Sequence, residues 1–312
     1  MYPNMAPEAR RVLERRHERS RIPYHRLSVE AARSAFRDHM TSNEPPPSVG
    51  RVRTTAIGDD RHPSLPLRIY SPDESGPHPV VVYFHGGGWV LGDLETHDVF
   101  CRELTRRAAV IVVAVDYRRA PEWRFPAPMV DGWRAVTWVA ENATYFGGDP
   151  ARLAVAGDSV GGTIATSVSM ACARWDGPEL AHQLLLHPAT DTTVDSESYD
   201  EYESGVIGSR AGMEQYWRYF LRDEFDRANP YAAPLRFPDV SPLPPARVLT
   251  CEYDPLRDEG MAYAERLGDA GVLREQVHED DVFHGYFLAV EFMDRASEGV
   301  DVIAEGLRAA LH

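Results

Sequence analysis

Uninterrupted apolar runs alternate with amphipathic stretches along most of this chain. Residues 80–84 and 109–115 are apolar throughout, which is typical of central strands covered on both faces. Further strands are expected at residues 51–57, 65–70, 153–156, 183–187, 246–251 and 274–278. Helical patterns occupy residues 93–107, 128–145, 160–174 and 260–268, and also lie within 287–311. Strands that alternate with helices predict an α/β fold with a mostly parallel central sheet flanked by helices.

Two regions depart from this alternation. Residues 7–40 have a helical pattern and are followed by a proline-rich linker at 41–50. Residues 191–227 are long, acidic and aromatic-rich, with a helical second half. We expect both regions to form a helical cap over the carboxyl edge of the sheet, where ligands bind in open α/β folds. The predicted division is cap helices at 1–45, a first core part at 46–190, a cap insertion at 191–228 and a second core part at 229–312.

The composition narrows the chemistry. The formal net charge of the 312 residues is -15, which argues against nucleic acid as a partner. The basic side chains other than histidine are all arginine, and the absence of lysine excludes Schiff-base chemistry, a P-loop lysine and a Ser–Lys dyad. No segment approaches the roughly 18 unbroken apolar residues of a membrane span, and we expect no signal peptide. The three cysteines lack metal-ligand spacing, so we expect reduced thiols in a cytoplasmic protein and no metal site.

A possible nucleophile lies in the glycine-rich segment GDSVGG at residues 157–162. An apolar strand precedes Ser159 and an alanine- and threonine-rich helix follows it. A nucleophilic serine needs a strained turn here, and Gly157 and Gly161 remove the Cβ atoms that would block it. We favour this interpretation over a plain glycine turn.

A second glycine-rich segment, HGGGW at residues 85–89, directly follows the apolar run at 80–84. Consecutive glycines let backbone N–H groups face a negatively charged oxygen. A phosphate-binding loop is the competing interpretation, but it would require an immediate helix start and a basic partner. His85 is interpreted as fixing the loop by hydrogen bonding, with a role as a base as the alternative.

The serine also requires a base and an orienting acid. Among the twelve histidines, His284 stands out because it falls in a loop between the strand at 274–278 and the last helical region. Asp254 follows the strand at 246–251. Glu252 and Asp258 compete with it, but Glu252 is expected within the strand and Asp258 is expected to cap the next helix. The chain order Ser, Asp, His is that of α/β-hydrolases.

These segments resemble the hormone-sensitive-lipase-like family of α/β-hydrolase carboxylesterases. The resemblance rests on HGGGWVLGDLETHD, the run DYRRAPE at 116–122, GDSVGG, the segment DPLRD at 254–258 and the pair His284-Gly285, all in family order. It implies a catalytic triad of Ser159, Asp254 and His284. It also implies an oxyanion hole built from the backbone N–H groups of Gly87, Gly88 and Val160.

The aromatic residues of the cap insertion favour apolar or aromatic esters, and the resemblance implies short- to medium-chain acyl groups, hydrolysis without a cofactor and a possible homodimer. Loop support is assigned to His85 and Asp158, and the substrate pocket to Trp89, Tyr202 and Tyr286. Two departures stand out. The family usually has alanine where this chain has Val160, whose extra methyl groups would narrow the site, and leucine where it has Arg119.

Two other functions stay open at this point. A carboxylesterase-like lyase would use the oxyanion hole to stabilise an enolate and could dispense with the serine. A non-catalytic small-molecule-binding relative would have lost the histidine, whereas this chain keeps His284. The acidic residues between 191 and 203 are interpreted as a solvated surface, with repulsion of anionic substrates as the alternative.

Overall fold

The computed structural model describes residues 2, 4–19, 22–41, 44–59, 62–202 and 208–312. Within them, eight strands form one sheet in the order β1-β2-β4-β3-β5-β6-β7-β8. The strands are β1 Arg51–Asp59, β2 His62–Ser71, β3 His78–Phe84, β4 Ile111–Val115, β5 Gly148–Asp158, β6 His182–Leu186, β7 Ala246–Tyr253 and β8 Leu273–Phe283. β1 and β2, and β2 and β4, pair antiparallel, and the other neighbouring strands pair parallel. The prediction of a mostly parallel sheet is confirmed.

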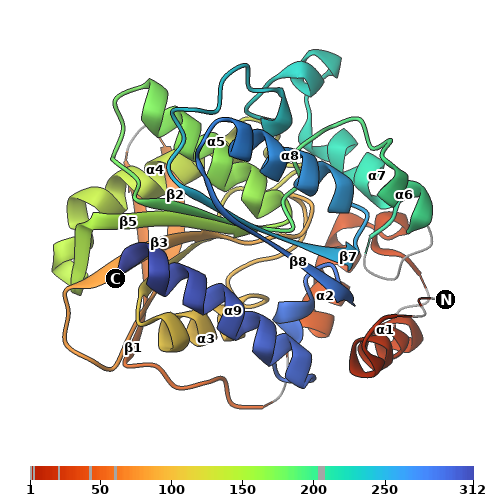
Figure 1. Cartoon of the computed structure of the whole chain (residues 1–312), viewed down its shortest axis with the longest axis horizontal. Coiled ribbons are helices and arrows are strands. Elements are labelled where there is room, and N and C mark those ends of the chain that lie inside the picture. The colour runs from red at the N-terminus through yellow and green to blue at the C-terminus, as the bar shows by residue number, and fades with distance from the viewer. Residues whose placement is uncertain (1, 3, 20–21, 42–43, 60–61, 203–207) are drawn as a thin grey trace.

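Helices cover both faces of this sheet (Figure 1). α4 (Ala127–Asn142), α5 (Val160–Arg174) and α8 (Arg257–Asp269) lie on one face, and α3 (Asp98–Ala108) and α9 (Asp294–Leu311) lie on the other. Short 3-10 helices complete this core: η2 Ala143–Phe146, η3 Glu224–Ala228, η4 Pro234–Arg236 and η5 Tyr286–Ala289. None of the helices formed by the described residues combines the length and apolar character needed to cross a membrane.

The apolar run of β3 is continuous because both of its faces are buried. Side chains alternate between the two faces of a strand, so Val80, Val82 and Phe84 pack into the core on the α4–α5–α8 side. Val81 and Tyr83 pack into the second core, on the α3–α9 side. Every residue of β3 is buried, which fixes the strand end that leads into the glycine-rich loop.

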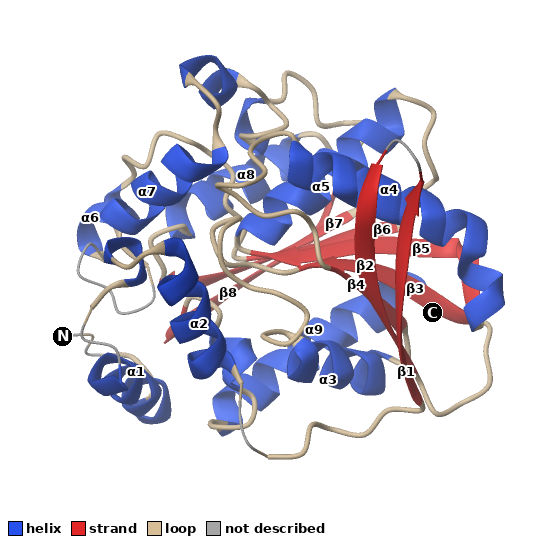
Figure 2. Cartoon of the chain, turned by 180° about the vertical axis from the view of Figure 1, so that it is seen from behind, coloured by secondary structure: helices blue, strands red, loops and turns tan. Residues whose placement is uncertain are grey.

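The remaining helices gather at the carboxyl ends of the strands. They are α1 Pro7–Arg19, η1 Tyr24–Arg26, α2 Val29–Met40, α6 Glu197–Glu201 and α7 Arg210–Phe220. The arrowheads of β7 and β8 point toward them in Figure 1, and Figure 2 shows the same grouping from behind. These helices come from both predicted cap regions, while the four-part domain division itself stays a prediction.

The N-terminal helices are held to the core by specific polar contacts. Glu8 of α1 accepts hydrogen bonds from the backbone N–H groups of Asp294 and Arg295, so it caps the start of α9. Arg33 of α2 donates to the carbonyl of Val90 at 2.8 Å and pairs with Glu122. Both α1 and α2 are therefore attached to the core by side-chain hydrogen bonds.

Several expected boundaries are wrong. The helix expected at 93–107 begins only at Asp98, because the Asp93 carboxylate accepts the backbone N–H groups of Glu95 and Thr96 and so forms a turn. The helical stretch at 7–40 contains the expected N-terminal helices, α1 and α2, with η1 between them. β8 extends to Phe283, beyond the expected end at 278, so the loop that carries His284 is shorter than expected.

Candidate active site

Ser159 occupies a strained turn between β5 and α5. Its backbone has φ 55° and ψ -122°, a combination that L-residues rarely adopt. A Cβ atom on Gly157 would collide with the backbone of Gly161, and one on Gly161 would collide with the carbonyl oxygen of Phe84. The two glycines therefore allow β5, the turn and α5 to pack closely while the turn presents Ser159 above the sheet edge.

Asp254 and His284 lie next to each other although 30 residues separate them in the chain. Asp254 follows β7 and His284 follows β8, and these strands are parallel neighbours. Nδ1–H of His284 donates to Oδ2 of Asp254 at 2.8 Å, and Oδ1 of Asp254 accepts the backbone N–H of Leu256 at 2.8 Å. Burial opposes the charged form of His284, but the Asp254 carboxylate outweighs it and raises the pKa of His284 above its usual value.

The glycine-rich loop and the start of α5 offer three backbone donors. Gly87 and Gly88 have φ values of 111° and 63° and line the same cavity as Ser159. Val160 is the first residue of α5, so no residue of its own helix can accept its N–H. Within the described part of the chain, no hydrogen bond uses the N–H groups of these three residues. They are available to a negatively charged oxygen.

Asp158 holds the glycine-rich loop against β5. Its Oδ1 accepts the Tyr83 hydroxyl at 2.5 Å and the Gly86 N–H at 2.8 Å, and lies 3.5 Å from Nε2 of His97. Burial disfavours the charge on Asp158, but these partners outweigh it and keep its pKa at about 2. Asp158 therefore remains an anion and an acceptor at neutral pH.

His85 stacks on Tyr117 with ring centroids 4.3 Å apart, and the Tyr117 hydroxyl donates to the His85 carbonyl. Burial lowers the pKa of His85 to about 3, and its ring does not line the cavity. These contacts support the loop and oppose a role as a base. Arg119, which stands where the family usually has leucine, donates to the carbonyl of Gly92 at 2.5 Å and so fixes the far end of this loop.

Ser159, Asp254 and His284 open onto one cavity of about 250 Å³, together with Gly87 and Gly88. Its outer wall is formed by apolar and aromatic side chains, most of them from the two cap regions: Tyr24, Phe36, Met40, Met213 and Tyr216, with Leu288 of η5 from the core. The aromatic ring of Tyr216 occupies the space beside Gly88 where a Cβ atom would lie. The cap thus reaches the glycine-rich loop directly.

The three expected pocket residues do not line this cavity. Trp89 is fully buried and stacks on Phe220 of α7 at 4.2 Å. Tyr202 packs near Tyr253 and donates its hydroxyl to Glu252 at 2.8 Å. Tyr286 is fully buried in the core on the α3–α9 side. In each case the aromatic ring packs against other parts of the chain and does not line the cavity.

Val160 does not narrow the site as expected. Its side chain is fully buried in the core on the α4–α5–α8 side and does not line the cavity. Asp258 is not the cap of α8 either, because that helix begins at Arg257 and the Asp258 carboxylate instead accepts the Ser198 N–H at 2.8 Å. Glu252 lies within β7 as expected, where it pairs with Arg257 at 2.7 Å.

The acidic run does not face the cavity. Asp191 pairs with Arg236, Asp200 with Arg210 and Glu201 with Arg257. Asp195 and Glu197 are exposed, and Glu203 lies outside the described residues. The described members of the run thus form surface ion pairs or face solvent, and none of them lines the cavity.

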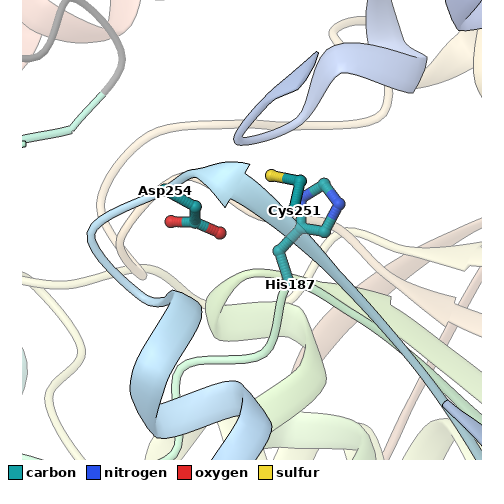
Figure 3. A group of neighbouring side chains, drawn as sticks. All are labelled: His187, Cys251 and Asp254. Atoms are coloured by element: carbon teal, nitrogen blue, oxygen red, sulfur yellow. The ribbon is translucent and has the colours of Figure 1, made fainter. Parts of the chain in front are cut away.

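A buried cluster beside the Asp254–His284 pair combines ligand types that bind metals. Among the described residues, His187, Cys251 and Asp254 have donor atoms within 4.8 Å of one another (Figure 3). Nδ1 of His187 accepts the Gly285 N–H at 3.0 Å, however, and Asp254 is bound by His284 and Leu256. Burial also raises the pKa of the Cys251 thiol well above its usual value. A metal ion would have to displace these contacts, so the cluster fits internal packing better.

Sequence reasoning missed three residues at the site. Nε2 of His97 lies 3.5 Å from the Asp158 carboxylate, His187 accepts the backbone N–H of Gly285 next to His284, and Tyr216 covers Gly88. His97 belongs to the motif at 85–98, and its position there was the available signal. The signal for His187 was weaker, since it consisted only of its position directly after a strand at the same sheet edge. Nothing in the local sequence distinguishes Tyr216 from its aromatic neighbours.

The chain is similar to known proteins over most of its length. A family model described as alpha/beta hydrolase fold matches residues 81–288. The chain is 39% identical over 289 residues to the carboxylesterase NlhH of Mycobacterium tuberculosis, covering 91% of this chain and 90% of that protein. It is 38% identical to the esterase LipI of the same species, covering 93% and 92%.

A solved structure has nearly the same backbone. The ester-hydrolase EH1AB1 from the metagenome of Lake Arreo, in complex with a derivative of bipyridine phosphonate, superimposes with a TM-score of 0.90. Its sequence is 36% identical, and the match covers 98% of each chain. With the sheet order, the serine turn and the Asp–His pair, these matches show that the chain belongs to the hormone-sensitive-lipase-like family of α/β-hydrolases.

Proposed function

We propose that this protein is a serine carboxylesterase that hydrolyses small esters through an acyl-enzyme intermediate. The observation that carries the proposal is the 2.8 Å hydrogen bond between His284 and Asp254, because it belongs to the cavity that Ser159 shares with the glycine-rich loop. A nucleophile, a base with its orienting acid and unpaired backbone donors are the parts that acyl transfer requires.

In the first half of the reaction, Oγ of Ser159 attacks the ester carbonyl carbon and His284 accepts the hydroxyl proton. The N–H groups of Gly87, Gly88 and Val160 stabilise the oxyanion of the tetrahedral intermediate, and each such donor typically contributes about 3 kcal/mol. Collapse of the intermediate breaks the bond to the alkoxy oxygen, which takes the proton from His284. The acyl group remains on Ser159 and the alcohol leaves.

In the second half, water attacks the acyl-enzyme while His284 accepts its proton. The same backbone donors stabilise the second tetrahedral intermediate, and collapse releases the carboxylic acid and restores Ser159. Asp254 fixes the orientation of the imidazole throughout and stabilises its charged form. The residues involved account for both halves of the reaction without a cofactor.

The cavity supports short- to medium-chain or aromatic esters as substrates. Its volume of about 250 Å³ lies just below the range of about 300–1,000 Å³ typical of ligand pockets. Aromatic and aliphatic side chains such as Phe36, Met213 and Leu288 form its walls, and they favour an apolar acyl or aryl group.

Acyl-enzyme formation can be tested directly. With a p-nitrophenyl ester of a short fatty acid, we expect a rapid burst of about one p-nitrophenol per active site whenever deacylation is the slower step. A p-nitrophenyl phosphonate is expected to inactivate the protein with a stoichiometry of one and to label Ser159, as peptide mass spectrometry would show. Labelling of another residue, or full activity after labelling, would contradict the proposal.

The pH dependence of ester hydrolysis follows from the Asp254–His284 pair. His284 must be neutral to accept the serine proton, so kcat/KM falls as the pH drops through its pKa. Because Asp254 raises that pKa, we expect the acidic limb of the profile, where kcat/KM falls with decreasing pH, to have its midpoint above pH 6.5. Replacing Asp254 with asparagine removes the charge and should move the limb to lower pH. A profile measured from pH 5 to 9 checks both statements, and an unmoved limb would argue against the pair.

The location and assembly of the protein remain proposals. The three cysteines are buried and form no disulfide, which supports a cytoplasmic location because thiols stay reduced there. A homodimer is proposed by resemblance to the family alone. The net charge of -15 opposes binding to nucleic acid.

A further inference from the structure

We propose that Arg16 makes this site selective for small esters that carry a carboxylate group. The inference rests on the proposed ester hydrolysis and names a substrate class for the same cavity. The N-terminal helices contribute one wall of the cavity, where α1 places Arg16 and η1 places Tyr24.

Arg16 is a cation without a matching anion. It lines the cavity that contains Ser159, and in the described part of the chain no carboxylate lies within ion-pair distance of its guanidinium. Its contacts are with the Met40 sulfur, at 4.0 Å, and with the ring of Phe283, whose centroid lies 5.5 Å away. Neither neighbour neutralises the charge, although the ring contact favours its position.

The other arginines that reach toward the cap differ from Arg16 in this respect. Arg33 pairs with Glu122, Arg37 with Asp93 and Arg257 with Glu252. Their charges are matched within the protein and leave no cationic site for a ligand. Arg16, by contrast, lines the cavity and has no carboxylate partner among the described residues.

The buried surroundings of Arg16 strengthen its interaction with an anionic ligand. Burial lowers the pKa of Arg16, but an arginine keeps its charge at neutral pH. Burial also raises the pKa of the adjacent Tyr24 to about 12, so that side chain remains a neutral hydroxyl and does not supply the missing negative charge. A partly desolvated guanidinium forms strong charge-assisted hydrogen bonds with a carboxylate.

The acidic groups of the cavity do not neutralise Arg16, because they already accept hydrogen bonds from other residues. Asp158 accepts hydrogen bonds from Tyr83 and Gly86, and Asp254 accepts them from His284 and Leu256. The net charge of -15 repels anions from the molecule as a whole. Recognition of a carboxylate therefore depends on a local cation, and Arg16 provides it at the wall of the catalytic cavity.

The test compares carboxylate esters with carboxamide esters of nearly the same shape. One pair, 4-acetoxybenzoate and 4-acetoxybenzamide, places the group on the alcohol side. The other, the monomethyl ester of terephthalic acid and methyl 4-carbamoylbenzoate, places it on the acyl side. The ratio of kcat/KM within a pair is measured for wild type and for Arg16→Gln. Dividing the two ratios cancels the difference in intrinsic reactivity between the esters.

In at least one pair, we expect Arg16→Gln to lower kcat/KM for the carboxylate ester about 10-fold or more, mainly through KM, and to leave the carboxamide ester within about twofold. Arg16→Lys should recover part of the loss. Benzoate should inhibit wild type competitively and more strongly than benzamide, and Arg16→Gln should remove that difference. Arg15→Gln is the matched control, because it removes an exposed charge from the same helix and should change neither ratio.

The inference is overturned if the carboxylate preference is the same in wild type and Arg16→Gln for both pairs, or if both members of each pair fall equally. An equal fall with a lower melting temperature would show a structural role for Arg16. p-Nitrophenyl butyrate separates this failure from failure of the proposed function. If wild type hydrolyses it without a carboxylate preference, only the inference fails, and if no ester is hydrolysed, both fail.

Discussion

Replacing Ser159 with alanine is expected to lower kcat/KM for p-nitrophenyl butyrate by about 10⁴- to 10⁶-fold. The variant keeps the backbone donors and the Asp254–His284 pair but has no oxygen that can form an acyl-enzyme. Only the direct attack of water within the cavity would remain. KM should change little, because the hydroxyl contributes little to binding of the ester in its ground state.

The control is Ser169→Ala, in the helix α5 that follows Ser159. Ser169 is also buried, but its hydroxyl donates to the carbonyl of Ala165, four residues earlier in α5, and it does not line the cavity. Activity should stay within about twofold of wild type, and circular dichroism should show both variants folded. Full hydrolysis by Ser159→Ala would refute the acyl-enzyme mechanism.

The Ser159→Ala variant also distinguishes the hydrolase from the lyase alternative. A lyase that stabilises an enolate would need His284 more than the serine. An elimination substrate turned over normally by Ser159→Ala but lost in His284→Ala would therefore favour that alternative. Loss of ester hydrolysis in both variants supports the hydrolase.

Replacing Asp254 with asparagine is expected to lower kcat by about 10⁴-fold, the effect known for the corresponding change in a serine protease triad. The amide has nearly the shape of the carboxylate, but it can present its N–H₂ group to Nδ1 of His284. The imidazole is then held in the wrong tautomer and its charged form loses the neighbouring anion. Steady-state kinetics with p-nitrophenyl butyrate at pH 8 measures this loss.

The matched control is Asp258→Asn, four residues further along the chain. Asp258 accepts the Ser198 N–H and pairs with Arg257, and it does not line the cavity. We expect activity within about threefold of wild type, since a partly exposed ion pair contributes little. Comparable losses in both variants would mean that Asp254 acts through the local structure rather than through His284.

The sequence alone allowed a good prediction of the fold. Apolar runs such as residues 80–84 identify central strands because both faces of those strands are buried. The sequence also predicts the turn at Ser159, because close packing there requires glycine at fixed spacing. Boundaries were less accurate where a side chain competes with the backbone, as when Asp93 delays the start of α3 to Asp98.

The pocket could not be predicted in the same way. Trp89, Tyr202 and Tyr286 were reasonable aromatic candidates, but each ring packs elsewhere. The direction of a side chain depends on neighbours that come from distant parts of the chain. The same holds for Val160, whose methyl groups enter the core instead of the cavity.

By itself, then, the sequence determined the parallel sheet and the residues with the chemistry of acyl transfer, because strand periodicity and glycine turns are local properties of the chain. Only the tertiary structure decided which side chains surround the substrate. Arg16 and Ser159 are separated by most of the first half of the chain, yet they line one cavity. That the charge of Arg16 has no described anionic partner follows from packing α1 against β8, and no local pattern of residues could have revealed it.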